Sequence, residues 1–258
     1  MGCGYVGERL AARLLATGHP VTATTRRPER ADELRRALPS LQVAVCAPEA
    51  APPGRGILCD SVPGDGAHLP GLIAATQARR VIYLSATSVY GLDSGGAWVD
   101  EDTPVRGDTV RGRERIAAES ALHTAADRAG IESVALRIAA IHGPGRGVAE
   151  RLRAGTYRVI GDGTAWTNRI HVDHLVNVII AAANVDPLPR RTYVVSDGVP
   201  TTAREYADAV AASLGLPPPP SVPVESVSTE AREMALGNRR LRTTRLTSEV
   251  HSDTSTKP

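Results

Sequence analysis

The chain has 258 residues, and its 30 Lys and Arg side chains nearly balance 28 Asp and Glu side chains, which leaves a formal net charge of +2. Such a small charge does not indicate a nucleic-acid-binding surface. No run of residues reaches the roughly 20 apolar residues that span a membrane, and three cysteines in dissimilar contexts argue against a disulfide framework. We therefore expect a cytoplasmic protein, long enough for one α/β domain with a small additional lobe.

The chain opens on a glycine-rich turn in which Gly2, Gly4 and Gly7 follow the pattern Gly-x-Gly-x-x-Gly. In dinucleotide-binding units the first glycine permits a tight turn, the second a close approach to a pyrophosphate, and the third close packing of the following helix. Leucines at helical spacing predict that helix over residues 5–16. The predicted cofactor contacts in this segment are Gly2, Gly4, Tyr5, Val6 and Gly7.

No strand precedes this turn, although a central strand of the sheet belongs there. Without that strand, its two neighbours lose a ladder of backbone hydrogen bonds inside the core. We therefore expect the natural chain to begin about five to eight apolar residues upstream of Met1, which is enough for one strand.

Strands and helices then alternate along the first half of the chain. The apolar patterns predict strands over residues 21–25, 41–46, 56–59, 80–85 and 134–141, and helices over 29–38, 69–77 and 111–129. This alternation implies parallel pairing with right-handed crossovers. We predict an α/β fold with a Rossmann-like, doubly wound parallel sheet that lacks its first strand, and a dinucleotide-binding domain over residues 1–150.

The alternation of strands and helices ends near residue 150, and shorter segments follow. Residues 151–246 are predicted to form mainly a small substrate-binding lobe, with part of 173–197 returning to the first domain. Short strands are expected over 157–160 and 167–172, around a hairpin turn at 161–163. Asp173 is expected to cap a helix that runs through Ala183. The polar residues 247–258 predict a disordered tail.

The second strand ends in Thr25, Arg26 and Arg27, and these residues bear on the choice of cofactor. At this position an acidic residue would bind the ribose 2′-hydroxyl of NAD, whereas arginines can pair with a 2′-phosphate. We therefore expect NADP to be favoured over NAD. The alternative is that both arginines are ordinary loop charges.

Residues 80–91 read Arg-Val-Ile-Tyr-Leu-Ser-Ala-Thr-Ser-Val-Tyr-Gly, and this segment resembles the fifth strand and following turn of the extended short-chain dehydrogenase/reductases, the NAD-dependent epimerase/dehydratase family. Further matches follow in family order at residues 98–104, 136–138, 143–146 and 169–173, and the similarity spans roughly residues 1–246. The resemblance implies three further cofactor contacts, namely Val62, Ser85 and Ala86.

The catalytic positions depart from this family pattern. Members resembling this chain carry a Ser or Thr in the strand-five turn and a Tyr-x-x-x-Lys on the next helix, where this chain has Ala86, Arg111 and Arg115. The only lysine is Lys257, so no Tyr-x-x-x-Lys is present. Because an arginine stays protonated, Arg111 cannot relay a proton as a tyrosine does. The usual mechanism is therefore excluded.

The remaining catalytic candidates are Tyr90, Thr87 and Arg115. The phenol of Tyr90 would act as a general acid if a nearby cation lowered its pKa, and the alternative is that Tyr90 packs in a structural turn. Arg115 would supply positive charge and hydrogen bonds to a ribose. His171 and His174 lack further ligands at metal-like spacing, so we expect no metal site.

Two functions stay open on these grounds. The first is an atypical reductase, epimerase or dehydratase that binds NADP and acts on a small carbonyl or sugar-like substrate. The second is a catalytically empty dinucleotide-binding protein that acts as a sensor or interaction partner. The resemblance also implies a homodimer formed through two central helices, and neither nucleic acid nor a membrane is an expected partner.

Overall fold

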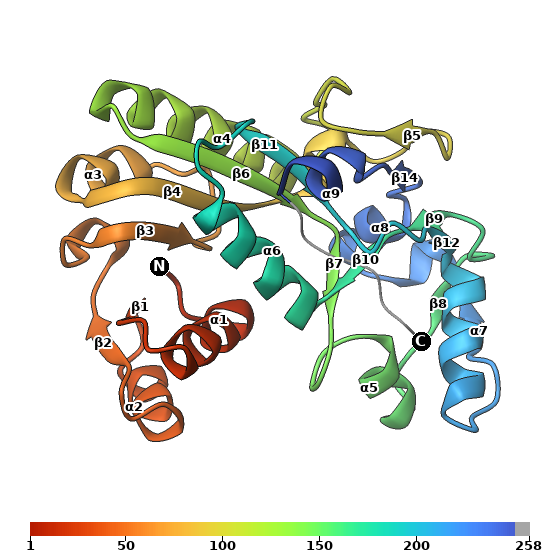
Figure 1. Ribbon diagram of the computed structural model, residues 1–258. Helices are drawn as coiled ribbons and strands as arrows, with labels where there is room; N and C mark the ends of the chain where they lie inside the picture. Colours follow the sequence, from red (N-terminus) through yellow and green to blue (C-terminus); the bar gives the residue numbers. More distant parts are fainter. Residues whose placement is uncertain (251–258) are drawn as a thin grey trace.

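The computed structural model describes residues 1–250, and a four-stranded parallel sheet in the order β11-β6-β4-β3 forms its centre (Figure 1). These strands are β3 (Arg55–Asp60), β4 (Gln77–Ala86), β6 (Glu132–Ile138) and β11 (Thr192–Val195). Successive residues Val81, Ile82 and Tyr83 of β4 are all fully buried, although their side chains alternate between the two faces. Helices therefore cover both faces, which is the arrangement expected of a parallel sheet.

Two further strands, β1 (Thr22–Thr25) and β2 (Gln42–Val45), pair with each other beside this sheet. The first residues of the chain lie between β1 and β3. The amino group of Met1 donates to the Cys59 carbonyl at 2.6 Å, and the Cys3 N–H donates to the Thr24 carbonyl at 3.0 Å. Met1 and its neighbours thus connect the two sheets by hydrogen bonds at the position where a central strand was predicted.

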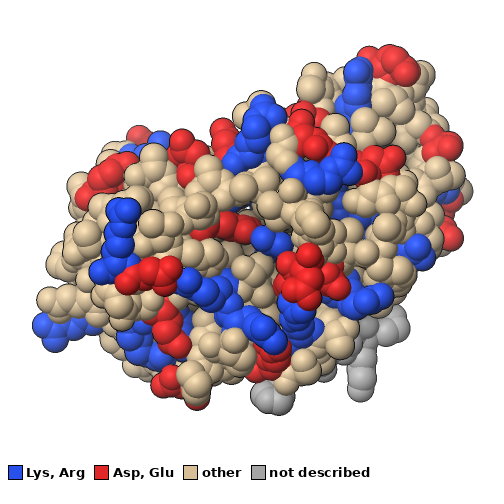
Figure 2. All heavy atoms as spheres, turned by 90° about the horizontal axis from the view of Figure 1, so that it is seen from above, with Lys and Arg blue, Asp and Glu red and all other residues tan. Residues whose placement is uncertain are grey.

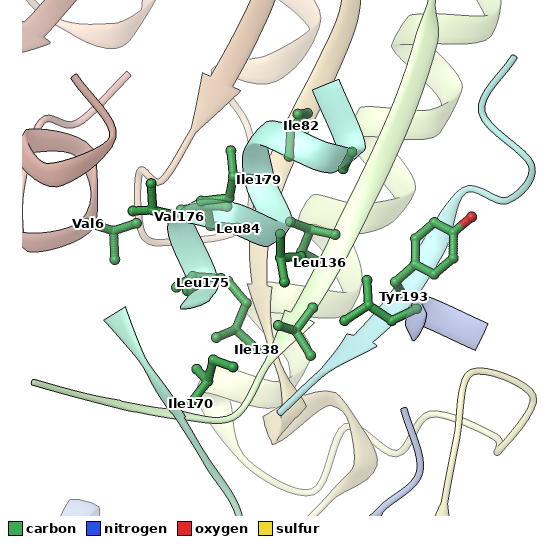
Figure 3. Packing of buried hydrophobic residues seen from close by; sticks show 14 of the residues in the cluster. Val6, Ile82, Leu84, Leu136, Ile138, Ile170, Leu175, Val176, Ile179 and Tyr193 are labelled. Carbon is green, nitrogen blue, oxygen red and sulfur yellow. The ribbon is translucent and has the colours of Figure 1, made fainter. Parts of the chain in front are cut away.

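Helices α3 (Leu69–Ala75) and α4 (Val110–Ala129) cover one face of the sheet, and α1 (Tyr5–Ala16) and α6 (Val172–Asn184) cover the other (Figure 1). Figure 3 shows Leu175 and Ile179 of α6 directed at Leu84 and Leu136 of the sheet. Helix α2 (Pro28–Ala37) packs on the separate strand pair. The predicted helical spacings are confirmed, because their apolar stripes make these contacts.

The remaining elements form smaller pairs at the other end of the molecule. Parallel pairs join β5 (Trp98–Val99) to β14 (Arg240–Leu241), β7 (Ala140–His142) to β10 (Arg169–His171), and β8 (Val159–Ile160) to β13 (Ser221–Val222); β9 (Trp166–Thr167) pairs antiparallel with β12 (Thr201–Thr202). The same part of the molecule contains helices α5 (Val148–Arg153), α7 (Ala203–Ser213) and α8 (Thr229–Ala235). No described helix is long and apolar enough to cross a membrane.

Three local predictions are wrong. The turn at 161–163 joins no hairpin, since β8 and β9 pair with other strands and Gly163 accepts a hydrogen bond from the Arg204 backbone at the start of α7. The strand predicted over 134–141 is two strands, β6 and β7. The cap of α6 is His171, whose Nδ1 accepts the Asp173 N–H at 3.3 Å, because the helix begins two residues earlier than predicted.

The predicted disordered tail is also wrong in its first part. Helix α9 (Thr244–Val250) buries Leu246 and Val250 in the main core cluster, against α6 and β11. The two side chains are four residues apart and share one helix face, so two apolar residues suffice to anchor an otherwise polar helix. The rest of the predicted tail, 251–258, lies outside the described residues.

The surface carries both signs of charge. Figure 2 shows basic and acidic side chains interspersed over the face seen from above, without a continuous patch of one sign. This mixture agrees with the small net charge of +2 for the whole sequence.

Candidate functional site

A cavity of about 730 Å³ lies at the carboxyl ends of β4 and β6. Residues from the glycine-rich turn and from the segment after β4 line it together, namely Gly2, Gly4, Tyr5, Val6, Ser85, Ala86, Thr87 and Ser88. In open α/β sheets, ligands bind in such a crevice outside the carboxyl ends of the strands. The structure therefore brings most of the predicted cofactor contacts into one cavity with Thr87 and Arg115.

The glycine-rich turn has the backbone geometry that the pattern predicts. Gly2 has φ of 67°, and a Cβ atom there would lie 3.1 Å from Oγ of Ser61, which donates to the Gly2 carbonyl at 2.8 Å. Gly4 is the N-cap of α1 and has no side chain to bond to the first turn. The N–H groups of that turn thus have no side-chain cap and can donate hydrogen bonds to an anion, whose binding the helix dipole also favours.

Five predicted cofactor residues do not line the cavity. Gly7 belongs to α1 and packs against Cys3, which precedes that helix. Val62 lies beside Gly2. Thr25 ends β1, where its Oγ1 accepts the N–H of Arg27 at 3.2 Å. Both Arg26 and Arg27 are exposed, and neither forms an ion pair within residues 1–250. These two guanidinium groups therefore lie at the surface beside the first two strands, without an internal partner.

Tyr90 does not face the cavity. Its side chain is 1% exposed, and its hydroxyl donates to the Asp100 carbonyl at 2.7 Å and accepts from Nη1 of Arg137 at 3.0 Å. Burial raises the pKa of Tyr90 to about 12, and the nearby charge of Arg137 opposes that rise only in part. This placement favours the structural alternative over the predicted role of Tyr90 as a general acid.

A buried polar network that the sequence analysis missed lies under the cavity. Ser85 donates to Oε1 of Glu119 at 2.6 Å, and Arg137 donates to Oε2 of the same carboxylate at 2.9 Å. The available signal was Arg137 itself, a charged residue inside the apolar run of β6. Because its hydrogen bond to Glu119 orients the Ser85 hydroxyl, this group is positioned by α4 and does not point its proton at a ligand.

The cavity is also lined by charged residues that sequence reasoning did not assign to it, namely Glu114, Arg146, Glu230, Glu233 and Arg239, and by Arg111 from the expected tyrosine position. Arg111 of α4 pairs with Glu230 of α8. Arg115, on the next turn of α4, donates to the hydroxyl of Tyr83. Burial lowers the pKa of Arg239, whose Nη1 donates to the Thr87 carbonyl at 2.7 Å. Arg239 is therefore part of the cavity wall.

A second cavity of about 350 Å³ lies between α5 and α7 and is lined by His142 and His171. The ring centroids of these histidines are 5.3 Å apart, and burial lowers the pKa of His142 to about 4, with the charge of His171 as the next cause. Among residues 1–250, no three His, Cys, Asp or Glu side chains are grouped as metal ligands.

Comparison with known proteins gives the family. The model of the NAD dependent epimerase/dehydratase family matches residues 67–196, half of the chain. The chain belongs to the NAD dependent epimerase/dehydratase family. A second model, described as NADP oxidoreductase, coenzyme F420-dependent, matches residues 1–86. The resemblance stated from the sequence motifs is thereby confirmed, as is the Rossmann-like fold class.

Similar proteins include other members of this fold. The 3-diazoavenalumate denitrifying reductase of a Streptomyces species is 29% identical over 257 residues, covering 85% of this chain and 82% of that protein. A conserved protein of unknown function from Silicibacter pomeroyi is 30% identical, with a TM-score of 0.83 over 97% of this chain and 90% of its own. The UDP-glucuronic acid 4-epimerase of Bacillus cereus, solved with NAD, is 13% identical with a TM-score of 0.80, covering 99% and 92%.

Proposed function

We propose that this protein is a reductase that transfers hydride from a nicotinamide dinucleotide to a small substrate. One observation carries the proposal: a single cavity extends from the glycine-rich turn at Gly2 and Gly4, past Ser85, to Arg111. The cofactor would occupy the glycine end and bring its nicotinamide to the end of β4, and the substrate would lie beyond it. Ligand sites of this kind are concave, largely preformed and few in a protein.

The residues present fit a dinucleotide. The family is described as NAD dependent, and the similar Bacillus cereus epimerase was solved with NAD. The uncapped N–H groups behind Gly4 would hold the pyrophosphate. We propose NADP as the preferred form, because Arg26 and Arg27 are exposed beside β1 and form no ion pair with a described residue that would compete with a 2′-phosphate. When bound, this cofactor supplies the hydride.

Reduction is favoured over epimerisation and dehydration by one named relative and by the cavity's chemistry. The Streptomyces relative is called a denitrifying reductase. Reduction of a carbonyl requires a proton donor at the oxygen, and Tyr90, the predicted general acid, is buried away from the cavity. We therefore propose a hydride acceptor that needs no proton from the protein.

An arenediazonium ion is such an acceptor, and the relative's name refers to a diazo compound. The hydride electron pair forms a new C–H bond at the ring carbon, and the electron pair of the C–N bond leaves with dinitrogen. No proton enters or leaves, and the dihydronicotinamide is oxidised by two electrons. Small carbonyl and sugar-like substrates are the competing class.

The test is turnover by the purified protein with NADPH or NADH. The substrates would be a carboxyl-substituted arenediazonium salt, a set of aldehydes and ketones, and UDP-sugars. We expect faster NADPH oxidation with the diazonium salt, release of dinitrogen, and transfer of deuterium from labelled NADPH to the ring carbon. Thermal protection by NADPH without turnover on any substrate would instead favour a sensor. If neither dinucleotide protects the protein, both functions fail.

The division into a dinucleotide-binding domain over 1–150 and a substrate lobe over 151–246 stays a prediction, as does the homodimer. Sedimentation of the purified protein with and without NADPH would measure the oligomeric state.

A further inference from the structure

We propose that the substrate carries a carboxylate that binds Arg111, and that Glu230 of α8 occupies this position until the substrate displaces it. The proposal rests on the reductase function proposed above and names the class of its substrate. It concerns the end of the cavity beyond Ser85, where α4 and α8 face each other.

Helix α4 places two guanidinium groups on the cavity wall. Arg111 and Arg115 are four residues apart, so both project from the same side of the helix. Arg111 is 56% exposed at its side chain, and Glu230 is its ion-pair partner. Arg115 donates to the neutral hydroxyl of Tyr83 and forms no ion pair with a described residue. One of the two cations is therefore paired with a displaceable carboxylate, and the other is without a counter-charge.

A third guanidinium lies deeper in the same wall. Arg239 is 6% exposed, and its Nη atoms donate to the backbone carbonyls of Thr87, Gly91 and Leu92. Its Nε is buried without a partner in the described part of the chain. A buried cation held only by carbonyls is poorly compensated, and an anion in the adjoining cavity would stabilise it. This orphaned donor is an observation independent of the arginines on α4.

The acidic side chains of the cavity come from two helices that differ in how firmly they pack on the core. Glu114 lies on the long helix α4, but Glu230 and Glu233 belong to α8, a helix without a single buried residue. Helix α8 is held at the surface by the Arg111 pair and by Arg232, whose Nε donates to the Val224 carbonyl at 3.3 Å. Displacing α8 would therefore remove two acids without opening the core, and would leave this end of the cavity positively charged.

The carboxylate of Glu230, which already binds Arg111, indicates the chemical class of the substrate group that would replace it. A guanidinium presents parallel N–H donors that match the two oxygens of a carboxylate. A substrate carboxylate would replace the carboxylate of Glu230 at the same donors, so the exchange conserves charge and hydrogen bonds. A phosphoryl group is the anion that must be distinguished from it by experiment.

The test uses fluorine NMR titration of a trifluoromethyl benzoate and of the matching benzamide, with and without NADPH. We expect the benzoate to bind about tenfold more tightly than the benzamide, as a charge-assisted bidentate pair would produce. Arg111→Gln should remove this preference without weakening the benzamide. Glu230→Gln should tighten benzoate binding, because it frees Arg111. Arg113→Gln is the matched control, since Arg113 is exposed on the same helix and does not line the cavity.

Equal binding of benzoate and benzamide would overturn the proposal, as would equal effects of the Arg111 and Arg113 variants or weaker benzoate binding by Glu230→Gln. Tighter binding of a trifluoromethyl phenylphosphonate than of the benzoate would overturn the carboxylate class. NADPH binding is followed separately by its fluorescence. Loss of NADPH binding with intact Arg111-dependent benzoate binding would refute the reductase alone, whereas turnover with Arg111-independent benzoate binding would refute this inference alone.

Discussion

The hydroxyl of Ser85, at the end of β4, donates a 2.6 Å hydrogen bond to Oε1 of Glu119 on α4. The same carboxylate accepts from Nε and Nη2 of Arg137 on β6, and both charged side chains are about nine-tenths buried. One carboxylate thus joins the ends of two strands to the helix that carries Arg111 and Arg115. The geometry of the cavity floor therefore depends on the ion pair between Glu119 and Arg137.

Glu119→Ala should lower the free energy of unfolding by about 3–5 kcal/mol, because it removes the ion-pair partner of the buried Arg137. Urea denaturation of the purified variant measures this loss. The double variant Glu119→Leu with Arg137→Leu is the control and should recover most of the stability. A loss below about 1 kcal/mol in the single variant, typical of an exposed pair, would show that the network is not a buried one.

Tyr90→Phe should lower stability by about 1–2 kcal/mol, since the Asp100 carbonyl and Arg137 each lose one hydrogen bond. The rate of hydride transfer should be unchanged, because the hydroxyl faces away from the cavity. Single-turnover oxidation of NADPH with the best substrate measures that rate. A well-folded Tyr90→Phe protein with a rate reduced a hundredfold or so would restore the general-acid role.

Replacing Arg26 and Arg27 together by alanine should weaken NADPH binding by about tenfold or more and leave NADH binding unchanged, because only NADPH carries the 2′-phosphate. Fluorescence titration with each dinucleotide checks this. Arg35→Ala provides the control, as Arg35 is an exposed arginine of α2 that pairs with Asp32. Parallel weakening of both dinucleotides would argue for a structural role of the loop.

Stability should fall as the pH drops below about 6.5, because His142 is held neutral in the folded protein. Burial is the main reason that its pKa is lowered to about 4, against 6.5 in the unfolded chain. Between these values the unfolded chain binds more protons, so lowering the pH favours unfolding.

His142→Gln should therefore reduce the difference in melting temperature between pH 7 and pH 5. The exposed His19 serves as a control position, and His19→Gln should leave that difference unchanged. An identical pH dependence in the His142 variant and the original protein would contradict this account.

Leu246→Ala should cost about 2–4 kcal/mol in unfolding free energy, because this side chain of α9 is completely buried in the main core. Leu236→Ala, at a position 41% exposed, should change stability little. Thermal or urea unfolding compares the two. Equal, small effects would mean that α9 does not belong to the core in solution.

Local patterns predicted much of the fold. The helix over 5–16 matches α1 to the residue, since its leucine spacing and the flanking Gly4 and Gly18 are local signals. Helix α9 was missed because only two apolar side chains anchor it, too few for a periodic signal. His171 was missed as a cap because the first residue of a helix depends on the preceding strand, here β10, as well as on the local residues.

The sequence alone determined the family motifs, the glycine-rich turn and the absence of Tyr-x-x-x-Lys, because a residue that is missing from a chain is missing in every fold. Only the tertiary structure decided which partners the charged side chains bind. Arg111 and Glu230 are 119 positions apart, and Arg239 and Thr87 are 152 positions apart. No local pattern specifies such pairs, since each depends on how remote segments pack around the same cavity.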